Sequence, residues 1–310
     1  MAVLSQNAAA VCPACLERGR PLRLTYERYR LFGCPRCRTQ YFRPDPRLAG
    51  RRQDTDTASE YWEEYKFDLY ANPAVQAGYE QRYDRALRTA RGVLGRPIAS
   101  VLDVGCGIGN FVHYAETRGM AAYGTDVEEK AVRAARDRGL AVATSADLDG
   151  LIGEDGALDA VTLWDVIEHL YEPDDVVRSC VARLVPDGVL VLETPDGAFP
   201  VRTAVRALHA VTGGRADLTG SLYYWEHKTY FTAAGLRSIL RRCGADVVSV
   251  RRDTSPKAKM QQMFDHYASG RSASRREKAL ATAWPLLEAA ARRVGAGNKL
   301  IVVARKRSRH

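Results

Sequence analysis

The strongest constraint on the fold is the stretch Val101-Leu102-Asp103-Val104-Gly105-Cys106-Gly107-Ile108-Gly109-Asn110-Phe111. An apolar run ends in an acid, and three glycines then alternate with other residues. The pattern predicts a buried strand that turns through a glycine loop into a helix. Glycines let the backbone approach a ligand because no Cβ intervenes, and the first turn of the helix offers unpaired N–H groups. The loop is therefore predicted to hold a ligand.

Two acids favour this interpretation over a plain turn in an α/β protein. Asp103 precedes the first glycine, where a phosphate-binding loop would not carry a negative charge. The next predicted strand, residues 121–125, ends at Asp126, whose carboxylate can accept hydrogen bonds from a ribose diol. An acid beside the loop also suits a cofactor that carries an amino or sulfonium group. Together these residues resemble the class I methyltransferases that use S-adenosylmethionine.

The resemblance extends over residues 98–304 and implies an α/β fold. The implied fold is a doubly wound, seven-stranded Rossmann-like sheet with helices on both faces. Its strands follow the order 3-2-1-4-5 with strands 7 and 6 beyond, and only the last strand is antiparallel. In this family an acid or amide after strand three contacts the adenine amine; Asp147 is the best match, and Asp149 is the alternative. The expected cofactor-binding residues are Asp103, Gly105, Cys106, Gly107, Gly109, Asp126, Val127, Asp147, Leu148 and Trp164.

A group of polar residues follows the predicted strand at residues 158–164. Ligands of open α/β sheets bind beyond the carboxyl ends of strands, which places Asp165, Glu168 and His169 at the mouth of the pocket. Acids and an imidazole this close can act as a general base or bind a divalent ion. In the alternative, Glu168 caps the next helix and His169 packs in the core. The stretch resembles the ubiquinone-biosynthesis O-methyltransferases, and some relatives of these hold Mg²⁺ there with an acid at the position of Asp165.

A second Glu-His pair, Glu226-His227, precedes two aromatic residues and Thr232, which is predicted to cap a helix over residues 233–243. In the same O-methyltransferases this segment borders the acceptor, so His227 is a second candidate base. The chain lacks the Asn/Asp-Pro-Pro-Tyr sequence that marks methylation of exocyclic amines of nucleic-acid bases. The candidate catalytic residues are His169, His227, Glu168 and Asp165.

Four cysteines near the start of the chain form two Cys-x-x-Cys pairs, Cys12/Cys15 and Cys34/Cys37, with 18 residues between the pairs. Zinc takes four thiolates in a tetrahedron, and two such pairs across a hairpin supply them. The spacing predicts a structural zinc ribbon, because four protein ligands leave no open position for a substrate. With four of the seven cysteines paired in this way, a reducing cytoplasm is favoured over disulfides.

The charge of the chain is unevenly distributed. Residues 1–52 carry 11 Arg or Lys against 3 acids, and residues 251–310 carry 15 against 4, whereas the whole chain has a net charge of only +9. The middle of the chain is therefore acidic. The arginines of the ribbon alternate with aromatic residues, a mixture that can bind nucleic acid or dock on the acidic middle.

The expected organisation has three parts. They are a zinc ribbon over residues 1–52, a linker with N-terminal helices or a lid over residues 53–97, and a methyltransferase domain over residues 98–310. The domain carries insertions at residues 197–222 and 252–296. The second insertion is basic and predicted to be helical. Covering the acceptor pocket, dimerisation and contact with a membrane surface are its alternative roles.

The leading hypothesis is transfer of a methyl group from S-adenosylmethionine to a hydroxyl of a small molecule, such as a sugar, a glycan or a natural-product intermediate. His169 or His227 would remove the hydroxyl proton. RNA methylation guided by the ribbon is the first alternative, and a non-catalytic binding protein on the same scaffold is the second. Zn²⁺ is the expected structural ion, and Mg²⁺ is a further candidate. No apolar run is long enough to span a bilayer and no signal peptide is recognisable, so a cytoplasmic location is expected; the oligomeric state stays open.

Overall fold

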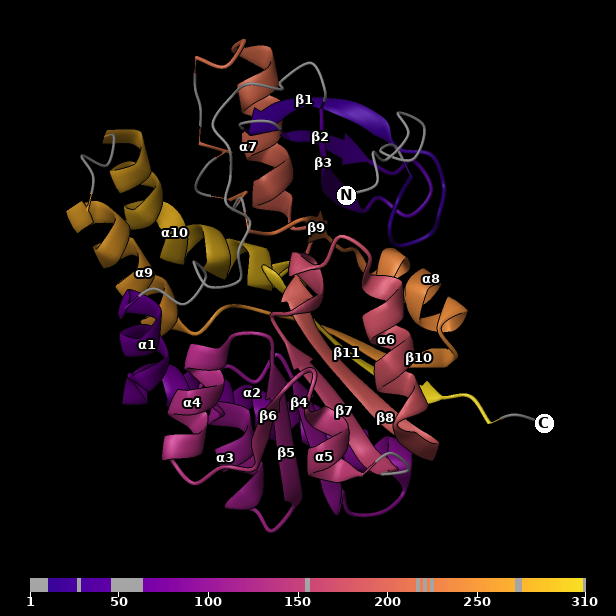
Figure 1. Cartoon of the computed structure of the whole chain (residues 1–310). Coiled ribbons are helices and arrows are strands. Elements are labelled where there is room, and N and C mark those ends of the chain that lie inside the picture. Colours follow the sequence, from indigo (N-terminus) through magenta and orange to yellow (C-terminus); the bar gives the residue numbers. More distant parts are fainter. Residues whose placement is uncertain are drawn as a thin grey trace.

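The computed structural model describes residues 11–26, 29–45, 64–153, 157–215, 218–219, 222–223, 226–270 and 275–308. Its centre is a seven-stranded sheet in the order β10-β11-β8-β7-β4-β5-β6 (Figure 1). Neighbouring strands from β8 to β6 are parallel, and β11 is antiparallel to both β8 and β10. The predicted order and direction are confirmed. The strands are β4 (Ser100–Val104), β5 (Ala121–Asp126), β6 (Val142–Thr144), β7 (Leu158–Trp164), β8 (Leu184–Pro195), β10 (Ala245–Asp253) and β11 (Lys299–Lys306).

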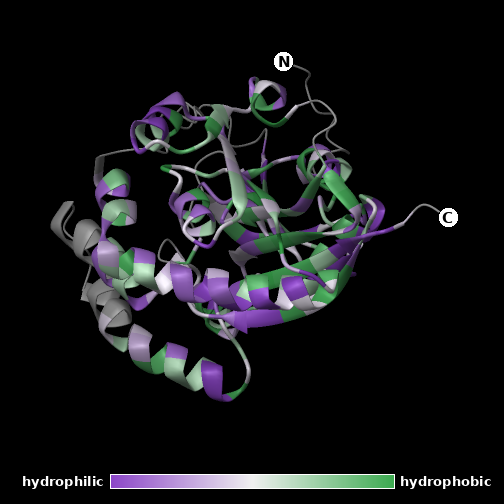
Figure 2. Cartoon of the chain, turned by 90° about the horizontal axis from the view of Figure 1, so that it is seen from below, coloured by the Kyte–Doolittle hydropathy of each residue, from purple (hydrophilic) through white to green (hydrophobic). Residues whose placement is uncertain are grey.

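Helices cover both faces of this sheet, as predicted. One apolar core joins the sheet to α2 (Pro73–Leu94), α3 (Asn110–Glu116) and α4 (Glu129–Asp137). A second core joins the opposite face to α6 (Pro173–Ala182) and α8 (Ala233–Arg242), with Leu148 of the short α5 (Leu148–Ile152). Because the sheet is covered on both sides, β7 is buried at every position. Figure 2 shows hydrophobic residues in the strands at the centre of the molecule. Along the helices, hydrophobic and hydrophilic residues alternate.

One local expectation changes. The sequence Pro-Asp-Gly at residues 186–188 predicts a turn before a strand at residues 189–193, but these residues lie inside β8. Leu158 pairs with Leu184 and Ala160 pairs with Val189, so β8 has extra residues here and the register between β7 and β8 shifts. Asp187, one of these extra residues, has a φ of +62° in the left-handed region.

The cysteine-rich segment forms a second sheet that borrows a strand from the distant part of the chain. Its strands are β1 (Arg20–Tyr26), β2 (Tyr29–Gly33), β3 (Gln40–Pro44) and β9 (Thr229–Tyr230). Gln40 pairs with Tyr230, and the N–H of Phe42 donates to the carbonyl of Lys228 over 2.8 Å. The division of the chain at residue 52 stays a prediction, but the ribbon sheet is completed by a strand from far outside that range.

The ribbon also packs against the first turn of α8. The hydroxyl of Thr232 caps α8 at the N–H of Gly235 and donates to the carbonyl of Cys37 over 2.5 Å. A Cβ at Gly235 would lie 2.2 Å from Oγ1 of Thr39, so only glycine allows this approach. Arg242 donates to the carbonyl of Ala14 over 2.9 Å. The ribbon is therefore joined to the large sheet by hydrogen bonds at both its strand and its cysteine loops.

Three aromatic side chains of the ribbon serve this packing. Tyr29, Tyr41 and Phe42 are 5% exposed or less, and the buried guanidinium of Arg43 lies 5.0 Å from the centre of the Tyr41 ring. Buried rings cannot stack on bases. Of the two roles that the sequence allows for these residues, the structure shows docking onto the rest of the chain.

Both insertions contain helices. The first contains α7 (Pro200–Val211), and the second contains α9 (Lys257–Gly270) and α10 (Arg275–Arg293). Trp284 of α10 packs 6.0 Å from Phe199, in a third apolar core that includes ribbon residues. The helix α1 (Glu64–Ala71) lies, with α2, in the range 53–97 that was predicted to hold N-terminal helices or a lid. None of the helices that the structure describes is long and apolar enough to cross a membrane.

Candidate functional site

A cavity of about 780 Å³ lies where β4, β5 and β7 end. Its size falls within the range of small-molecule sites. It brings together eight of the ten predicted cofactor residues, and Gly109 and Asp147 are outside its lining. The eight are Asp103, Gly105, Cys106, Gly107, Asp126, Val127, Leu148 and Trp164.

The glycine loop forms the floor of this cavity. Gly105 has a φ of +74°, and a Cβ there would lie 2.4 Å from Cγ2 of Val166. The N–H of Gly107 donates to Oδ2 of Asp126 over 2.8 Å, which ties the loop to the end of β5. Gly109 has a different role, because a Cβ there would lie 2.4 Å from Cδ1 of Leu140, so it permits close packing of α3.

Two buried acids face this loop. Asp103 accepts a hydrogen bond from the hydroxyl of Thr162 over 2.6 Å, and burial raises the pKa of Asp103 to about 8. Asp126 accepts from the N–H groups of Gly107 and Glu128, and burial raises its pKa as well. Asp147 differs from both, because it is exposed and accepts from Oγ1 of Thr144 over 2.6 Å.

The four candidate catalytic residues divide into two pairs. Asp165 and His169 line the cavity, whereas Glu168 and His227 are not in its lining. Nδ1 of His169 lies 3.1 Å from the carbonyl oxygen of Glu226. A carbonyl only accepts, so Nδ1 carries the proton and Nε2 carries the lone pair of the neutral ring. Burial lowers the pKa of His169 to about 4, which keeps the ring neutral near pH 7.

Glu168 and His227 lie close to His169, outside the cavity lining. The His227 ring packs edge-on against the His169 ring, with 4.9 Å between the centroids. Glu168 accepts from the hydroxyl of Thr194 over 2.9 Å, and burial, with the nearby charge of Asp165, raises its pKa to about 8. The capping role considered for Glu168 is wrong, because α6 is preceded by Glu172 at its N-cap position.

Among the residues that the structure describes, two groups of side chains could hold a metal ion. The first is Cys12, Cys15, Cys34 and Cys37; the second is Glu168, His169 and His227; in each group the possible ligand atoms lie within 4.8 Å of one another. Oxygen ligands suit Mg²⁺, whereas two imidazoles and one carboxylate suit softer ions such as Zn²⁺. Asp165 belongs to neither group.

The four thiols have the geometry of a zinc site. The Sγ atoms of Cys12 and Cys37 are 3.6 Å apart and those of Cys15 and Cys34 are 3.4 Å apart. A zinc tetrahedron with bonds of about 2.3 Å has edges of about 3.8 Å. The two loops also match each other, since Leu16 and Arg38, which follow each pair, have φ values of +63° and +65°. Two loops of similar conformation therefore bring their four thiols close together, as four ligands of one zinc ion must be.

Comparison with known proteins decides the family. A methyltransferase domain model matches residues 75–250, which is more than half of the chain. The chain belongs to the methyltransferase domain family.

Curated relatives of this methyltransferase-family chain include ubiquinone biosynthesis O-methyltransferases. The chain is 34% identical over 119 residues to that of Chromobacterium violaceum, covering 36% of this chain and 49% of the relative. It is 30% identical over 158 residues to that of Xanthomonas axonopodis pv. citri, covering 49% and 64%. It is 30% identical over 176 residues to that of Vibrio campbellii, covering 52% and 71%. The chain therefore spans between about half and two thirds of the first two relatives.

Solved structures agree on the fold. A S-adenosylmethionine-dependent methyltransferase from Archaeoglobus fulgidus has a TM-score of 0.50 at 18% identity, covering 79% of this chain and 100% of that one. The [4+2]-cyclase SpnF also has a TM-score of 0.50, at 19% identity, covering 83% and 98%. Because a cyclase shares the fold, the fold alone does not decide the reaction of this methyltransferase-family chain.

The cavity of this family member fits S-adenosylmethionine. The buried carboxyl of Asp103 suits an amino or sulfonium group, and Asp126 at the end of β5 suits a ribose diol. The loop at Gly105 and Gly107 allows the close approach that such a molecule needs. Sequence reasoning missed Lys259 and Lys299, which contact Asp165, because no local pattern connects them to the strand end.

Asp103→Asn is expected to reduce the pH dependence of stability. In the unfolded chain Asp103 loses its proton near its ordinary pKa of 3.8, whereas in the folded chain its pKa is about 8. Unfolding between these pH values releases a proton, so the free energy of unfolding falls as pH rises. The slope is about 1.4 kcal/mol per pH unit for an isolated group, and the loss is complete above the folded pKa. Urea unfolding across this range measures the slope. The matched control is Asp137→Asn at an exposed position of α4; a variant at Asp103 that keeps the full slope would contradict the assignment.

Proposed function

We propose that this chain transfers a methyl group from S-adenosylmethionine to a hydroxyl oxygen of a small molecule. The observation that carries the proposal is His169, a neutral imidazole in the cavity wall whose lone pair is on Nε2. The names of the curated relatives support a hydroxyl acceptor. The family membership supports the methyl donor.

The residues of the cavity have different roles in the proposed reaction. Bound S-adenosylmethionine supplies an activated methyl group. Asp126 and the glycine loop hold the nucleoside end, and a cationic group bound beside Asp103 would lower the raised pKa of its carboxyl and favour the charged form. Holding donor and acceptor in one enclosed cavity is the main contribution of the protein, because alignment replaces a bimolecular encounter. His169 accepts the hydroxyl proton at Nε2.

The surroundings of His169 prepare it for this proton. Its Nδ1 donates to the carbonyl of Glu226, which fixes the ring and its tautomer. The negative charge of Asp165 favours the imidazolium and so opposes the effect of burial on the pKa of His169. Edge-on packing by His227 restricts the ring further. We therefore assign His169 as the proton acceptor, and His227, Glu168 and Asp165 as residues that support it.

We also propose that the four cysteines hold a structural zinc ion. The sulfur separations, the matched loops and the free thiols support this assignment. The ion would stabilise a segment too small to form its own core, and the four ligands leave no position for a substrate.

The proposal is tested with labelled S-adenosylmethionine, by comparing a small-molecule extract of the source organism with its total RNA. Label is expected in a small molecule that carries a new methyl ether. Label in RNA alone would overturn the choice of acceptor, and no label with no binding of S-adenosylmethionine would overturn methyl transfer itself.

His169→Asn is expected to lower turnover by about 10²–10⁴-fold, the usual contribution of a general base. The affinity for S-adenosylhomocysteine should stay unchanged, because the proposal assigns the His169 ring to the acceptor and not to the cofactor. His227→Asn should have a smaller effect, since His227 acts through His169. The control is His113→Asn at an exposed position of α3. Full turnover in the His169 variant would show that another group accepts the proton.

A further inference from the structure

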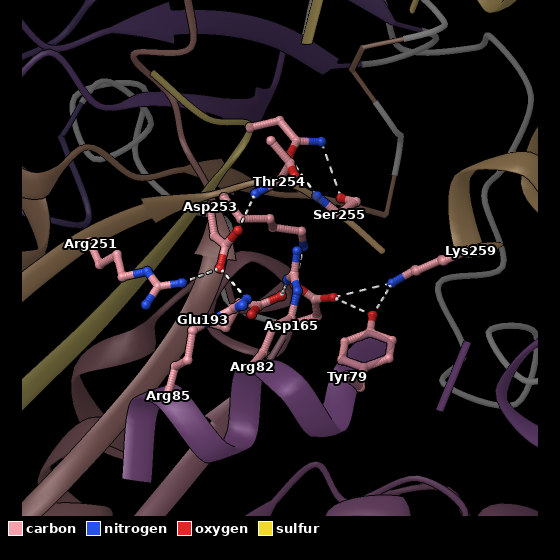
Figure 3. Close-up of polar contacts among 12 residues, drawn as sticks. Tyr79, Arg82, Arg85, Asp165, Glu193, Arg251, Asp253, Thr254, Ser255 and Lys259 are labelled. Atoms are coloured by element: carbon pink, nitrogen blue, oxygen red, sulfur yellow. Dashed lines mark hydrogen bonds and ion pairs between the residues drawn. The ribbon is translucent and has the colours of Figure 1, made fainter. Parts of the chain in front are cut away.

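Asp165 has an unusual position at the end of β7. Its φ is +57°, although it is not glycine, and its N–H donates to the carbonyl of Glu193 over 3.0 Å. Aspartate tolerates this conformation better than most residues, but it still costs conformational energy. The bend directs the carboxyl group into a buried cluster at the edge of the cavity (Figure 3).

Two ammonium groups contact this carboxylate. Oδ1 accepts from Nζ of Lys299, at the start of β11, and Oδ2 accepts from Nζ of Lys259, on α9, over 3.2 Å. The hydroxyl of Tyr79 also donates to Oδ2 over 3.2 Å. Both oxygens of Asp165 therefore already have cationic partners.

This arrangement does not suit a divalent ion at Asp165. Mg²⁺ binds carboxylate oxygens at about 2.0–2.1 Å and keeps several waters around it. Here the Lys259 and Lys299 ammonium groups lie against the same oxygens, and they would repel a third cation. The Mg²⁺ that the resemblance implies for an acid at this position does not fit the residues present.

Lys259 also organises the wall of the cavity. Its Nζ donates to the hydroxyl of Tyr79 over 2.5 Å and to that of Tyr70 over 3.3 Å. It lies 5.3 Å from the ring centre of Tyr70 and 5.2 Å from that of Tyr79. Tyr70, Tyr79 and Asp165 all line the cavity, so one side chain from the insertion connects three of its residues.

We propose that Lys259 and Lys299 take the place of a divalent ion at Asp165, and that Lys259 is a positioning residue through which the α9 insertion shapes the cavity. This assigns the insertion its first alternative role, covering the acceptor pocket. The proposal rests on the proposed function because Asp165 lines the cavity to which methyl transfer is assigned. Its test needs neither an acceptor nor methyl transfer.

The test compares melting temperatures of the full, zinc-loaded chain with and without millimolar Mg²⁺. The wild type is expected to melt at the same temperature in both conditions. Lys259→Met should melt several degrees lower, and Mg²⁺ should recover part of this loss by restoring a positive charge beside Asp165. The recovery should disappear when Asp165→Asn is added. Lys259→Arg should behave like the wild type because it keeps the charge.

Lys257→Met, at an exposed position of the same helix, is the matched control and should melt like the wild type without responding to Mg²⁺. Stabilisation of the wild type by Mg²⁺ that Asp165→Asn removes would overturn the proposal, because the ion and not the lysines would then pair with Asp165. Failure of Mg²⁺ to raise the melting temperature of Lys259→Met would overturn the claim that a lysine takes the place of a divalent ion at Asp165. A Lys259→Met protein that melts like the Lys257 control would overturn the positioning role.

Discussion

Cys37→Ala is expected to abolish stoichiometric zinc binding and to unfold the ribbon. The segment that carries His227 should become less stable as well. Structural zinc contributes about 10–16 kcal/mol in isolated zinc-finger peptides. Part of this is retained here by contacts with α8, so we expect the free energy of unfolding to fall by at least about 5 kcal/mol. The carbonyl of Cys37 accepts from Thr232, and β3 pairs with β9 two residues after His227. Loss of the ribbon therefore removes partners of the segment that carries His227.

Zinc content by elemental analysis and hydrogen exchange by mass spectrometry measure this effect. Exchange should rise in the ribbon and at residues 228–236, but not in β5, which is on the far side of the large sheet. The matched control is Cys180→Ala, which removes a buried free thiol outside the four-cysteine group and should keep one zinc per chain. A Cys37→Ala protein with one zinc per chain and unchanged exchange would contradict the assignment.

Arg82→Leu is expected to destabilise the fold by about 3–5 kcal/mol, the usual result of removing one partner from a buried ion pair. Nη1 of Arg82 donates to Oε1 of Glu193 over 2.6 Å, and their side chains are 2% and 0% exposed (Figure 3). Without Arg82, the Glu193 carboxylate is buried without its cation and is driven to bind a proton. Burial already raises the pKa of Glu193 in the wild type, and loss of Arg82 should raise it further. The destabilisation should therefore grow as pH rises above the pKa of Glu193 in the folded wild type toward neutrality.

Urea unfolding of the single and double variants tests this prediction. Combining Arg82→Leu with Glu193→Leu should recover most of the loss, because apolar pairs often replace buried ion pairs without cost. The control is Arg88→Leu at an exposed position of the same helix, which should change stability by less than about 0.5 kcal/mol. An Arg82→Leu effect as small as the control would show that water reaches Glu193.

Much of the large sheet was predictable because its signals are local. Apolar runs bounded by acids and glycines marked β4, β5 and β7, and Thr232 marked the start of α8. The order of the strands came from the family resemblance and was confirmed. The course of β8 at residues 186–188 was not predicted, because Pro-Asp-Gly is typical of a turn, whereas Leu184 and Val189 on either side of these residues pair with β7.

The candidate site was predictable in its members but not in its layout. The sequence marks Asp165, Glu168 and His169 as neighbours, but their orientations depend on the bend at Asp165 and the short helix η4 (Ile167–His169). As a result His169 lines the cavity, whereas Glu168, one residue away, accepts from Thr194. Roles for these residues stay predictions until the variants are measured.

The sequence by itself determined the elements whose causes lie within a few residues of one another. Spacing alone marked the glycine loop and the two cysteine pairs, because backbone conformation and ligand geometry act over short range. Only the tertiary structure decided the contacts between distant segments: β9 completing the ribbon, and Lys259 and Lys299 meeting Asp165 from two other elements. These contacts depend on how whole layers pack. Hydrophobic periodicity marks the buried face of an element, but it does not mark which distant residue that face contacts.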